Sequence, residues 1–146
     1  MTLSDILRSK GSQVHTISAT ATLEDVVQAL VRHNCGSLVV CEGSDCQQGR
    51  LLGIITERDI LRACAAHEAG LDELRVAELM TRELIVGSPE DSIEDTMGLL
   101  TDKRIRHLPV VHNNQLLGLI SIGDVVKWQH DTLSMENHYL KTYIHG

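Results

Sequence analysis

The 146-residue sequence predicts an α/β protein built from two tandem repeats, each with the order strand, helix, strand, strand, helix. Leu23-Glu24-Asp25 recurs 70 residues later as Ile93-Glu94-Asp95, and the run 37–40 aligns with 107–110 at the same distance. Such internal similarity is the mark of a repeated structural unit. One repeat cannot cover both faces of so small a sheet, so we expect the two to pack together about a pseudo-two-fold axis.

The first helix of each repeat is indicated by its apolar periodicity and its start signal. In the first copy the apolar residues recur at helical spacing, at Leu23, Val26, Val27, Leu30 and Val31. Thr22 with Asp25, and Ser92 with Asp95, have the spacing of a helix-capping pair. Two amphipathic helices are therefore predicted, one beginning after Thr22 and the other after Ser92.

A pair of β-branched runs follows each helix and predicts a hairpin. In the first repeat these runs are 38–40 and 51–56, and in the second they are 108–111 and 116–121. The first repeat carries five extra residues between Cys41 and Arg50, which indicates a lengthened hairpin loop. The second repeat is expected to turn at His112–Gln115, and the closing helices begin at Glu57 and Ile122.

The flanking segments complete the predicted organisation. Residues 1–75 are assigned to the first repeat with its N-terminal segment and linker, 76–130 to the second repeat, and 131–146 to a C-terminal helical tail. Residues 76–81 read as a helical turn that leads into the second repeat. The tail is partly apolar, so it packs either on the body or on a second subunit.

Composition narrows the class of protein. Aromatic residues make up 2% of the chain and Phe is absent, so the core must be aliphatic. The net charge of −7 argues against a nucleic-acid binder, which needs a basic surface. The first residues do not read as a signal peptide, and no apolar run approaches the length of a membrane span. We therefore expect a cytoplasmic protein.

Of the four cysteines, Cys35 and Cys64 lie in apolar-periodic segments and are expected to be buried free thiols. None forms a C-x-x-C pair, and no zinc-ligand spacing is present. Cys41 and Cys46 flank a polar stretch, so a redox pair or a weak metal site there remains an alternative.

The same motif closes both repeats. A glycine, two apolar residues, a hydroxyl residue, two further residues and an aspartate occur at 53–59 and again at 118–124. A hydroxyl followed three residues later by an acid is an ordinary helix start. In a ligand site, however, the helix N-terminus suits a phosphate, the hydroxyl can donate to it, and the carboxylate can accept from the hydroxyls of a ribose. The recurrence in both repeats favours the ligand site.

Together with the Arg106–Val110 run and Met80-Thr81, these motifs make the chain resemble a cystathionine-β-synthase (CBS) domain pair, also called a Bateman module. The resemblance covers nearly the whole chain. In this family the paired domains form two clefts that commonly bind AMP, ATP, NAD or related ligands. It implies ribose contacts from Asp59 and Asp124, phosphate contacts from Thr56 and Ser121, and a phosphate neighbour in Arg58. The full predicted set of nucleotide-binding residues is Ser18, Ser37, Thr56, Arg58, Asp59, Arg106, His107, Ser121 and Asp124.

The leading functional hypothesis is a regulatory module that senses an adenine nucleotide, AMP, ATP or NAD(H), and acts on a partner protein or its own assembly. An enzyme is disfavoured, because the chain has no G-x-x-x-x-G-K-[ST] or G-x-G-x-x-G motif and no nucleophile–base pair. A protein–protein interaction module without a ligand, and a Cys/His redox or metal sensor, remain alternatives. The resemblance also implies a disc-shaped homodimer.

Overall fold

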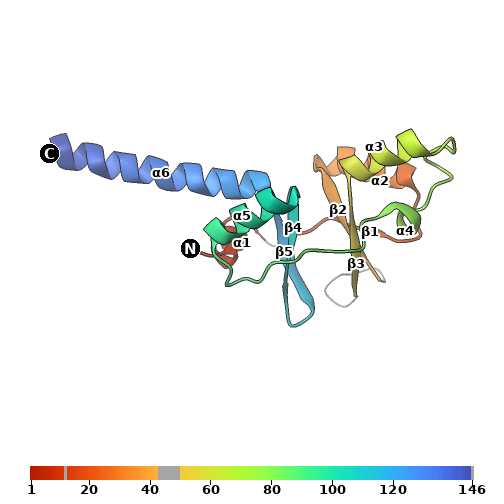
Figure 1. The fold of residues 1–146 in the computed structure, drawn as a ribbon, viewed down its shortest axis with the longest axis horizontal. Helices are drawn as coiled ribbons and strands as arrows, with labels where there is room; N and C mark the ends of the chain where they lie inside the picture. Colours follow the sequence, from red (N-terminus) through yellow and green to blue (C-terminus); the bar gives the residue numbers. More distant parts are fainter. Residues whose placement is uncertain (12, 43–49, 146) are drawn as a thin grey trace. The chain divides into compact units, whose positions relative to one another are not determined.

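The computed structural model describes residues 1–11, 13–42 and 50–145 and divides into two compact units (Figure 1). Unit 1 contains residues 1–12, 87–110 and 118–146, and unit 2 contains 13–86 and 111–117. In chain order the elements are α1 (Leu3–Lys10), β1 (Thr16–Ser18), α2 (Leu23–His33), β2 (Ser37–Cys41), β3 (Leu51–Thr56), α3 (Glu57–Ala66), α4 (Val76–Leu79), α5 (Ile93–Lys103), β4 (His107–His112), β5 (Gln115–Ser121) and α6 (Ile122–His145).

The first repeat forms unit 2 and has the predicted order of strands and helices. Its three strands lie in the order β1-β2-β3, with β1 parallel to β2 and β2 antiparallel to β3. The predicted capping pair is confirmed, since the Thr22 side chain accepts from the Asp25 amide and the Asp25 carboxylate accepts from the Thr22 amide. The core is aliphatic, as the composition requires, and joins α2, α3 and α4 to the sheet.

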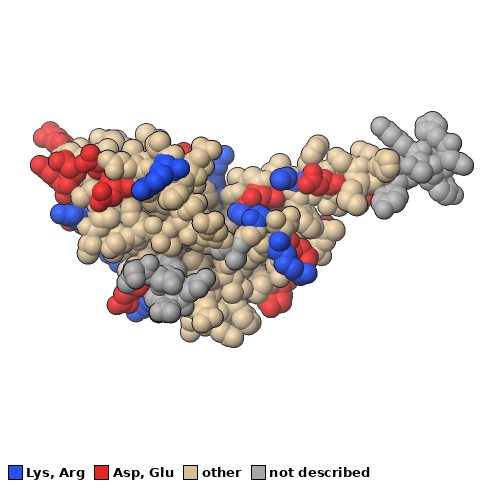
Figure 2. All heavy atoms as spheres, turned by 180° about the vertical axis from the view of Figure 1, so that it is seen from behind, with Lys and Arg blue, Asp and Glu red and all other residues tan. Residues whose placement is uncertain are grey.

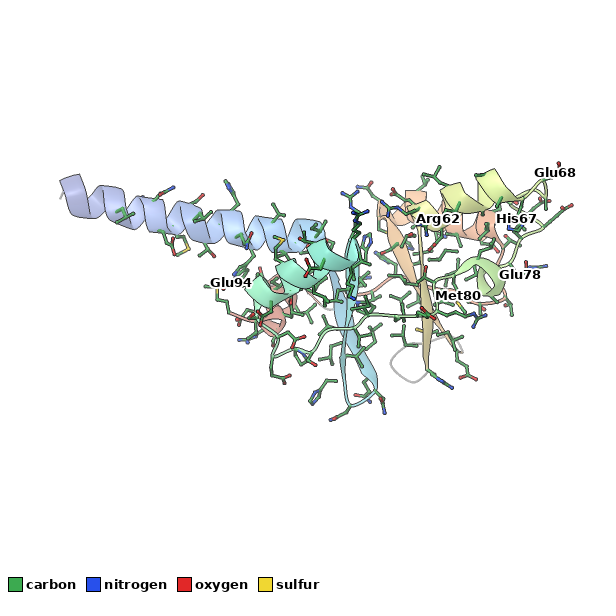
Figure 3. The ribbon with its side chains drawn as sticks, in the orientation of Figure 1. Arg62, His67, Glu68, Glu78, Met80 and Glu94 are labelled. Atoms are coloured by element: carbon green, nitrogen blue, oxygen red, sulfur yellow. The ribbon has the colours of Figure 1, made fainter. Side chains whose placement is uncertain are left out.

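The segment Val76–Thr81 packs on the first repeat, whereas the sequence suggested a lead into the second. Val76 donates its amide to the carbonyl of Ala21, and Thr81 and Ile54 exchange backbone hydrogen bonds of 2.8 and 3.0 Å. The glycine of the motif permits this approach, because a Cβ on Gly53 would lie 2.6 Å from the Thr81 carbonyl oxygen. Figure 3 shows the Met80 side chain beside β3. Glycine at position 53 is therefore required by tertiary packing.

Most of the second repeat, apart from residues 111–117, forms unit 1 together with α1. The backbone of α1 is tied to the segment before α5, with Leu3 donating to the Asp91 carbonyl and Ser4 to that of Pro89, both at 3.0 Å. A Cβ on Gly118 would lie 2.6 Å from a terminal methyl of Leu7. The absence of a side chain at Gly118 thus lets α1 pack against β5, as the absence of one at Gly53 lets residues 80–81 pack against β3. The N-terminal helix therefore packs in space with elements of the second repeat.

The second repeat lacks a full counterpart of β1. In its place Gly87 forms a single parallel bridge with Val110 and donates to the carbonyl of Pro109 at 2.9 Å. In the first repeat the Val39 amide donates to the His15 carbonyl at 3.0 Å. The counterpart of Val39, 70 residues later, is Pro109. Because proline has no N–H, it cannot donate the backbone hydrogen bond that Val39 donates in the first repeat.

The β4–β5 hairpin turns at the predicted place. Asn113 and Asn114 have φ values of 51° and 62°, the left-handed pair of a type I′ turn, which favours asparagine. The last helix, α6, continues as one helix to His145 and includes the predicted tail (Figure 1). No helix in the described part of the chain is long and apolar enough to cross a membrane.

Candidate functional site

The first-repeat site begins where β3 ends and α3 starts. The Asp59 carboxylate turns back to this junction and accepts from the Thr56 amide at 2.9 Å and from the Thr56 hydroxyl at 3.2 Å. Thr81 adds a third donor, with its hydroxyl 3.2 Å from Asp59 Oδ1. Asp59 is 8% exposed. The carboxylate is thus a capping acid and also joins α3 to the segment after α4.

Two of the three backbone amides at the start of α3 are engaged within the protein. The Glu57 amide donates to the Gly36 carbonyl at 3.1 Å, and the Asp59 amide donates to the Thr56 hydroxyl at 3.4 Å. Arg58 lies between them with an exposed side chain. Within the described residues, the Arg58 amide is the first-turn donor left for a ligand.

The register of the sheet decides which predicted residues meet at this site. Ser37 begins β2 and is paired with Thr56, so the two lie together at the junction of β3 and α3. Ser18 is paired with Cys41, at the other end of β2. Ser37 and Cys41 are four residue steps apart along β2, about 13 Å at roughly 3.3 Å per step. The structure therefore brings together Ser37, Thr56, Arg58 and Asp59, and it does not bring Ser18 to them.

A stacked pair of histidines lies in the same repeat. The His15 and His33 rings have centroids 3.9 Å apart and an interplanar angle of 12°. Burial of His15, followed by the charge of His33, lowers the pKa of His15. Because Thr16 is paired with Val39, His15 lies level with Leu38, nearer the Ser37 end of β2 than the end where Ser18 pairs with Cys41. Sequence analysis missed it, since the two histidines are brought together only by the fold.

The second-repeat site repeats the cap with a different third partner. Asp124 accepts from the Ser121 amide at 2.8 Å, and the Asp124 amide donates to the Ser121 hydroxyl at 3.1 Å. In place of a threonine hydroxyl, the ammonium group of Lys10 lies 2.6 Å from Asp124 Oδ2. Lys10 also donates to the Leu119 carbonyl at 2.9 Å. The second site therefore contains an internal ion pair.

This ion pair changes the ionisation of the carboxylate. Burial by itself would raise the pKa of Asp124, because it penalises the charged form. The hydrogen bonds from Lys10 and the Ser121 amide, together with the charge of Lys10, outweigh that effect, so the pKa of Asp124 is lowered. Asp124 is an ionised hydrogen-bond acceptor over the whole neutral range.

Arg106 and His107 lie where the second repeat places its counterpart of Gly36-Ser37. The Arg106 carbonyl accepts from the Ile122 amide at 2.8 Å, and His107 is the first residue of β4. The Arg106 side chain is exposed and His107 is half-buried. The Arg106 backbone is therefore tied to the start of α6, next to Ser121, and His107 follows Arg106 in the chain.

Thr81 and Lys10 were missing from the predicted set. Thr81 was noticed in the sequence as part of Met80-Thr81, but its contact with Asp59 needs the fold. Lys10 is 114 residues from Asp124, and nothing in the local sequence links them. Both contacts come from segments that pack on a motif glycine, and that shared arrangement is visible only in three dimensions.

The metal or redox alternative can be tested only for the cysteines and histidines that the structure describes. In the described part of the chain, no group of three or more His, Cys, Asp or Glu side chains could hold a metal ion. Cys35 and Cys64 are free thiols, as predicted, but the expectation that they are buried is wrong, because Cys35 is half-buried and Cys64 is exposed. Cys41 is disulfide-bonded, so it is not a free thiol. Cys46 lies outside the described residues, so a redox role for Cys41 and Cys46 stays a prediction.

Comparison with known proteins shows to which family the chain belongs. The family model of the CBS domain matches residues 3–66 and 76–131. The mitochondrial CBS domain-containing protein CBSX3 of Arabidopsis thaliana is 37% identical over 99% of this chain and 72% of its own length. A crystal structure of a CBS-domain containing protein from Agrobacterium tumefaciens aligns with a TM-score of 0.82, at 33% identity over 88% of this chain and 99% of that one.

A hexameric CBS-CP12 protein from bloom-forming cyanobacteria aligns with a TM-score of 0.72, at 31% identity over 86% of this chain and 69% of that one. The chain therefore belongs to the CBS domain family, with two tandem copies, and the predicted fold class is confirmed. CBS domain proteins are in general regulatory modules that bind adenosine ligands. The cytoplasmic location stays a prediction, and the Arabidopsis relative is named as mitochondrial.

Proposed function

We propose that this protein is a sensor of adenine nucleotides, with one nucleotide site at the motif of each repeat. The observation that carries the proposal is the doubled geometry. In both repeats a hydroxyl and a carboxylate face each other across the first turn of a helix, and a third polar side chain joins them. The N2 amides of both helices, at Arg58 and Gly123, remain for a phosphate oxygen. Such a helix N-terminus favours an anion.

The roles follow from the chemistry of each group. Asp59 and Asp124 accept hydrogen bonds from the ribose hydroxyls, and Ser121 donates to phosphate. Thr56 does the same once its hydroxyl turns from Asp59 to the ligand, because a hydroxyl has a single proton to donate. Ser37, Arg58, Arg106 and His107 border the two sites. Ser18 lies away from this cluster and has no part in the proposal. The ligand is AMP, ATP or NAD(H), bound and released without chemical change, and the output is control of a partner protein or of self-assembly.

Alanine variants of the two acids test this assignment by calorimetry against AMP, ATP, NAD and NADH. Loss of charge-assisted hydrogen bonds worth about 1.5–3 kcal/mol each should weaken binding at the altered site roughly tenfold or more. Asp25→Ala is the matched control, because Asp25 forms the same capping box with Thr22 at the start of α2. Unchanged affinity in a variant with both Asp59→Ala and Asp124→Ala would leave the motifs as helix caps.

The regulatory role also excludes turnover. The purified protein should leave these nucleotides intact over hours of incubation, as followed by chromatography. Hydrolysis that co-purifies with the protein and disappears in Asp59→Ala or Asp124→Ala would replace the sensor by an enzyme.

One observation favours a second function, an interaction module without a ligand. Asp59 is nearly buried and already has three donors, which suits a structural cap. A thermal-shift panel separates the candidates. Stabilisation by nucleotides supports the sensor, no response supports the interaction module, and sensitivity to metal ions or oxidants supports the redox or metal alternative. At a ligand concentration 100 times the dissociation constant, the stabilisation should reach about 2.7 kcal/mol.

We also propose that the protein forms a homodimer through unit 2. A groove of about 530 Å³ between α2 and α3 is lined mainly by apolar side chains, among them Val27, Val31, Ile60 and Leu61. Val31 and Leu61 are 76% and 71% exposed. Exposed apolar surface of this kind is typical of an interface. The relative whose structure is described as hexameric shows that a related protein assembles.

Sedimentation tests the dimer. The wild-type protein should sediment as a dimer of the 16.1 kDa chain, and a variant with both Val31→Glu and Leu61→Glu should sediment as a folded monomer. Val86→Glu, at another exposed apolar residue of unit 2, is the control and should remain dimeric. A wild-type monomer at high protein concentration would contradict the proposal.

A further inference from the structure

The two motifs differ in charge next to the carboxylate. In the first repeat the residues between Thr56 and Asp59 are Glu57 and Arg58, so a guanidinium follows the cap directly. In the second repeat they are Ile122 and Gly123, which supply no cation. A phosphate placed at the start of α6 by the same geometry would therefore meet no cation from the motif itself, and the positive charge must come from other segments, such as that of Arg106, whose carbonyl accepts from the Ile122 amide.

The fold brings a cation to the second site from the other end of the sequence. Lys10 is the last residue of α1, and its ammonium group is held by Asp124 at 2.6 Å and by the Leu119 carbonyl at 2.9 Å. An ammonium group has three N–H donors, so one remains for a further acceptor. The Lys10 side chain is 36% exposed and that of Asp124 is 23% exposed, so a ligand can reach the pair.

The position of Lys10 does not depend on the ion pair alone. The start of α1 is fixed by the backbone hydrogen bonds of Leu3 and Ser4, and Leu7 packs against Gly118. Next to the pair, Gly123 is exposed, and a Cβ there would meet nothing closer than 3.6 Å. The backbone at the second position of α6 is therefore open, and Lys10 is held beside it.

We propose that Lys10 binds phosphate in the second-repeat site and supplies there, from outside the motif, the cation that Arg58 supplies from within the motif in the first. This inference rests on the proposed nucleotide function. A ligand whose ribose hydroxyls reach Asp124 would place its phosphate where the third donor of Lys10 and the Gly123 amide meet it. Lys10 would then make this site selective for phosphorylated ligands over the neutral nucleoside.

The test uses Asp59→Ala as background, which leaves the second site to report alone, and compares AMP with adenosine by calorimetry. Lys10→Met should weaken AMP binding about tenfold or more, since a charge-assisted hydrogen bond is lost. Adenosine affinity should change less than about twofold, because adenosine carries no phosphate. Lys10→Arg should keep most of the preference for AMP. Arg8→Met is the matched control, because it removes a cation from another face of α1, where Arg8 pairs with Asp5.

The other outcomes separate the failure of Lys10 from the failure of the proposed function. Equal AMP affinity in Lys10→Met and its parent, or equal loss for AMP and adenosine, would overturn the phosphate-binding role. AMP binding by the wild type that disappears in Asp59→Ala would also overturn it, because the second repeat would then have no nucleotide site. A wild-type protein that binds neither ligand would overturn the nucleotide function itself, and the role of Lys10 with it.

Discussion

The two repeats place the same acid at the start of a helix but hold it by different chemistry. Asp59 receives a neutral hydroxyl from Thr81, while Asp124 receives an ammonium group from Lys10. In both cases the third partner comes from a segment that packs on the glycine of the motif. The shared part, the cap, is local in sequence. The part that differs is tertiary, and it is the part that can give the two sites different ligand preferences.

The largest difference in stability between the two repeats is expected from substitution of the two motif glycines. A methyl group at position 53 meets the Thr81 carbonyl oxygen, which is backbone and cannot move freely, whereas at position 118 it meets the flexible end of Leu7. Gly53→Ala should therefore destabilise the protein by about 2–3 kcal/mol and Gly118→Ala by about 1 kcal/mol. Urea unfolding measures both, and an equal loss would show that the two contacts are equivalent.

The third partner of each acid should contribute unequally to stability. Thr81→Val removes a hydroxyl that donates to a nearly buried carboxylate and should cost about 1–1.5 kcal/mol. Lys10→Met removes a partly exposed ion pair, worth about 0–1 kcal/mol after solvent screening. Unfolding of the two variants in parallel, at low and high salt, checks this order. Only the Lys10 variant should lose its effect as salt increases.

The helix that precedes each hairpin ends on a left-handed residue, which is Asn34 in the first repeat and Arg104 in the second. Their φ values are 50° and 54°, and asparagine tolerates this region better than arginine. Arg104→Asn should therefore stabilise the protein by roughly 0.5–1 kcal/mol, and Asn34→Arg should destabilise it by a similar amount. Thermal unfolding of both variants tests the symmetry. A loss of stability in Arg104→Asn would mean that the arginine side chain contributes a contact of its own.

The smallest expected effect is the acid dependence of the second repeat. Because folding lowers the pKa of Asp124 below its unfolded value of 3.8, the associated stability is present above that pH. It is lost as the pH falls through the lower, folded pKa. In Lys10→Met burial still raises the pKa, both contributions of Lys10 are gone and only the hydrogen bonds from Ser121 still lower it, so the loss should begin at higher pH. Carboxyl titration by NMR should show the pKa of Asp124 rising, with that of Asp25 unchanged as the internal control.

Much of the fold could be predicted because its signals are local. The repeat offset, the apolar periodicity and the capping pair at Thr22 and Asp25 located the helices and hairpins, and the structure confirms them. The exception is the first strand of the second repeat, which shrinks to one bridge at Gly87. Pro109 occupies the position in β4 that Val39 occupies in β2, and it has no N–H to donate to a neighbouring strand. The proline is visible in the sequence, but its effect on the first strand of the second repeat is seen only once the strand pairing is known.

The candidate site likewise has a part that could be predicted from local sequence and a part that could not. From the sequence alone came the two capped acids, the hydroxyls that face them and the charge difference between Glu57-Arg58 and Ile122-Gly123, because all of these lie within one turn of a helix start. Only the tertiary structure decided that Lys10 reaches Asp124, that Thr81 reaches Asp59 and that Ser18 lies at the far end of β2. Contacts between residues 22 and 114 positions apart depend on how whole segments pack, and no local pattern of residues encodes that packing.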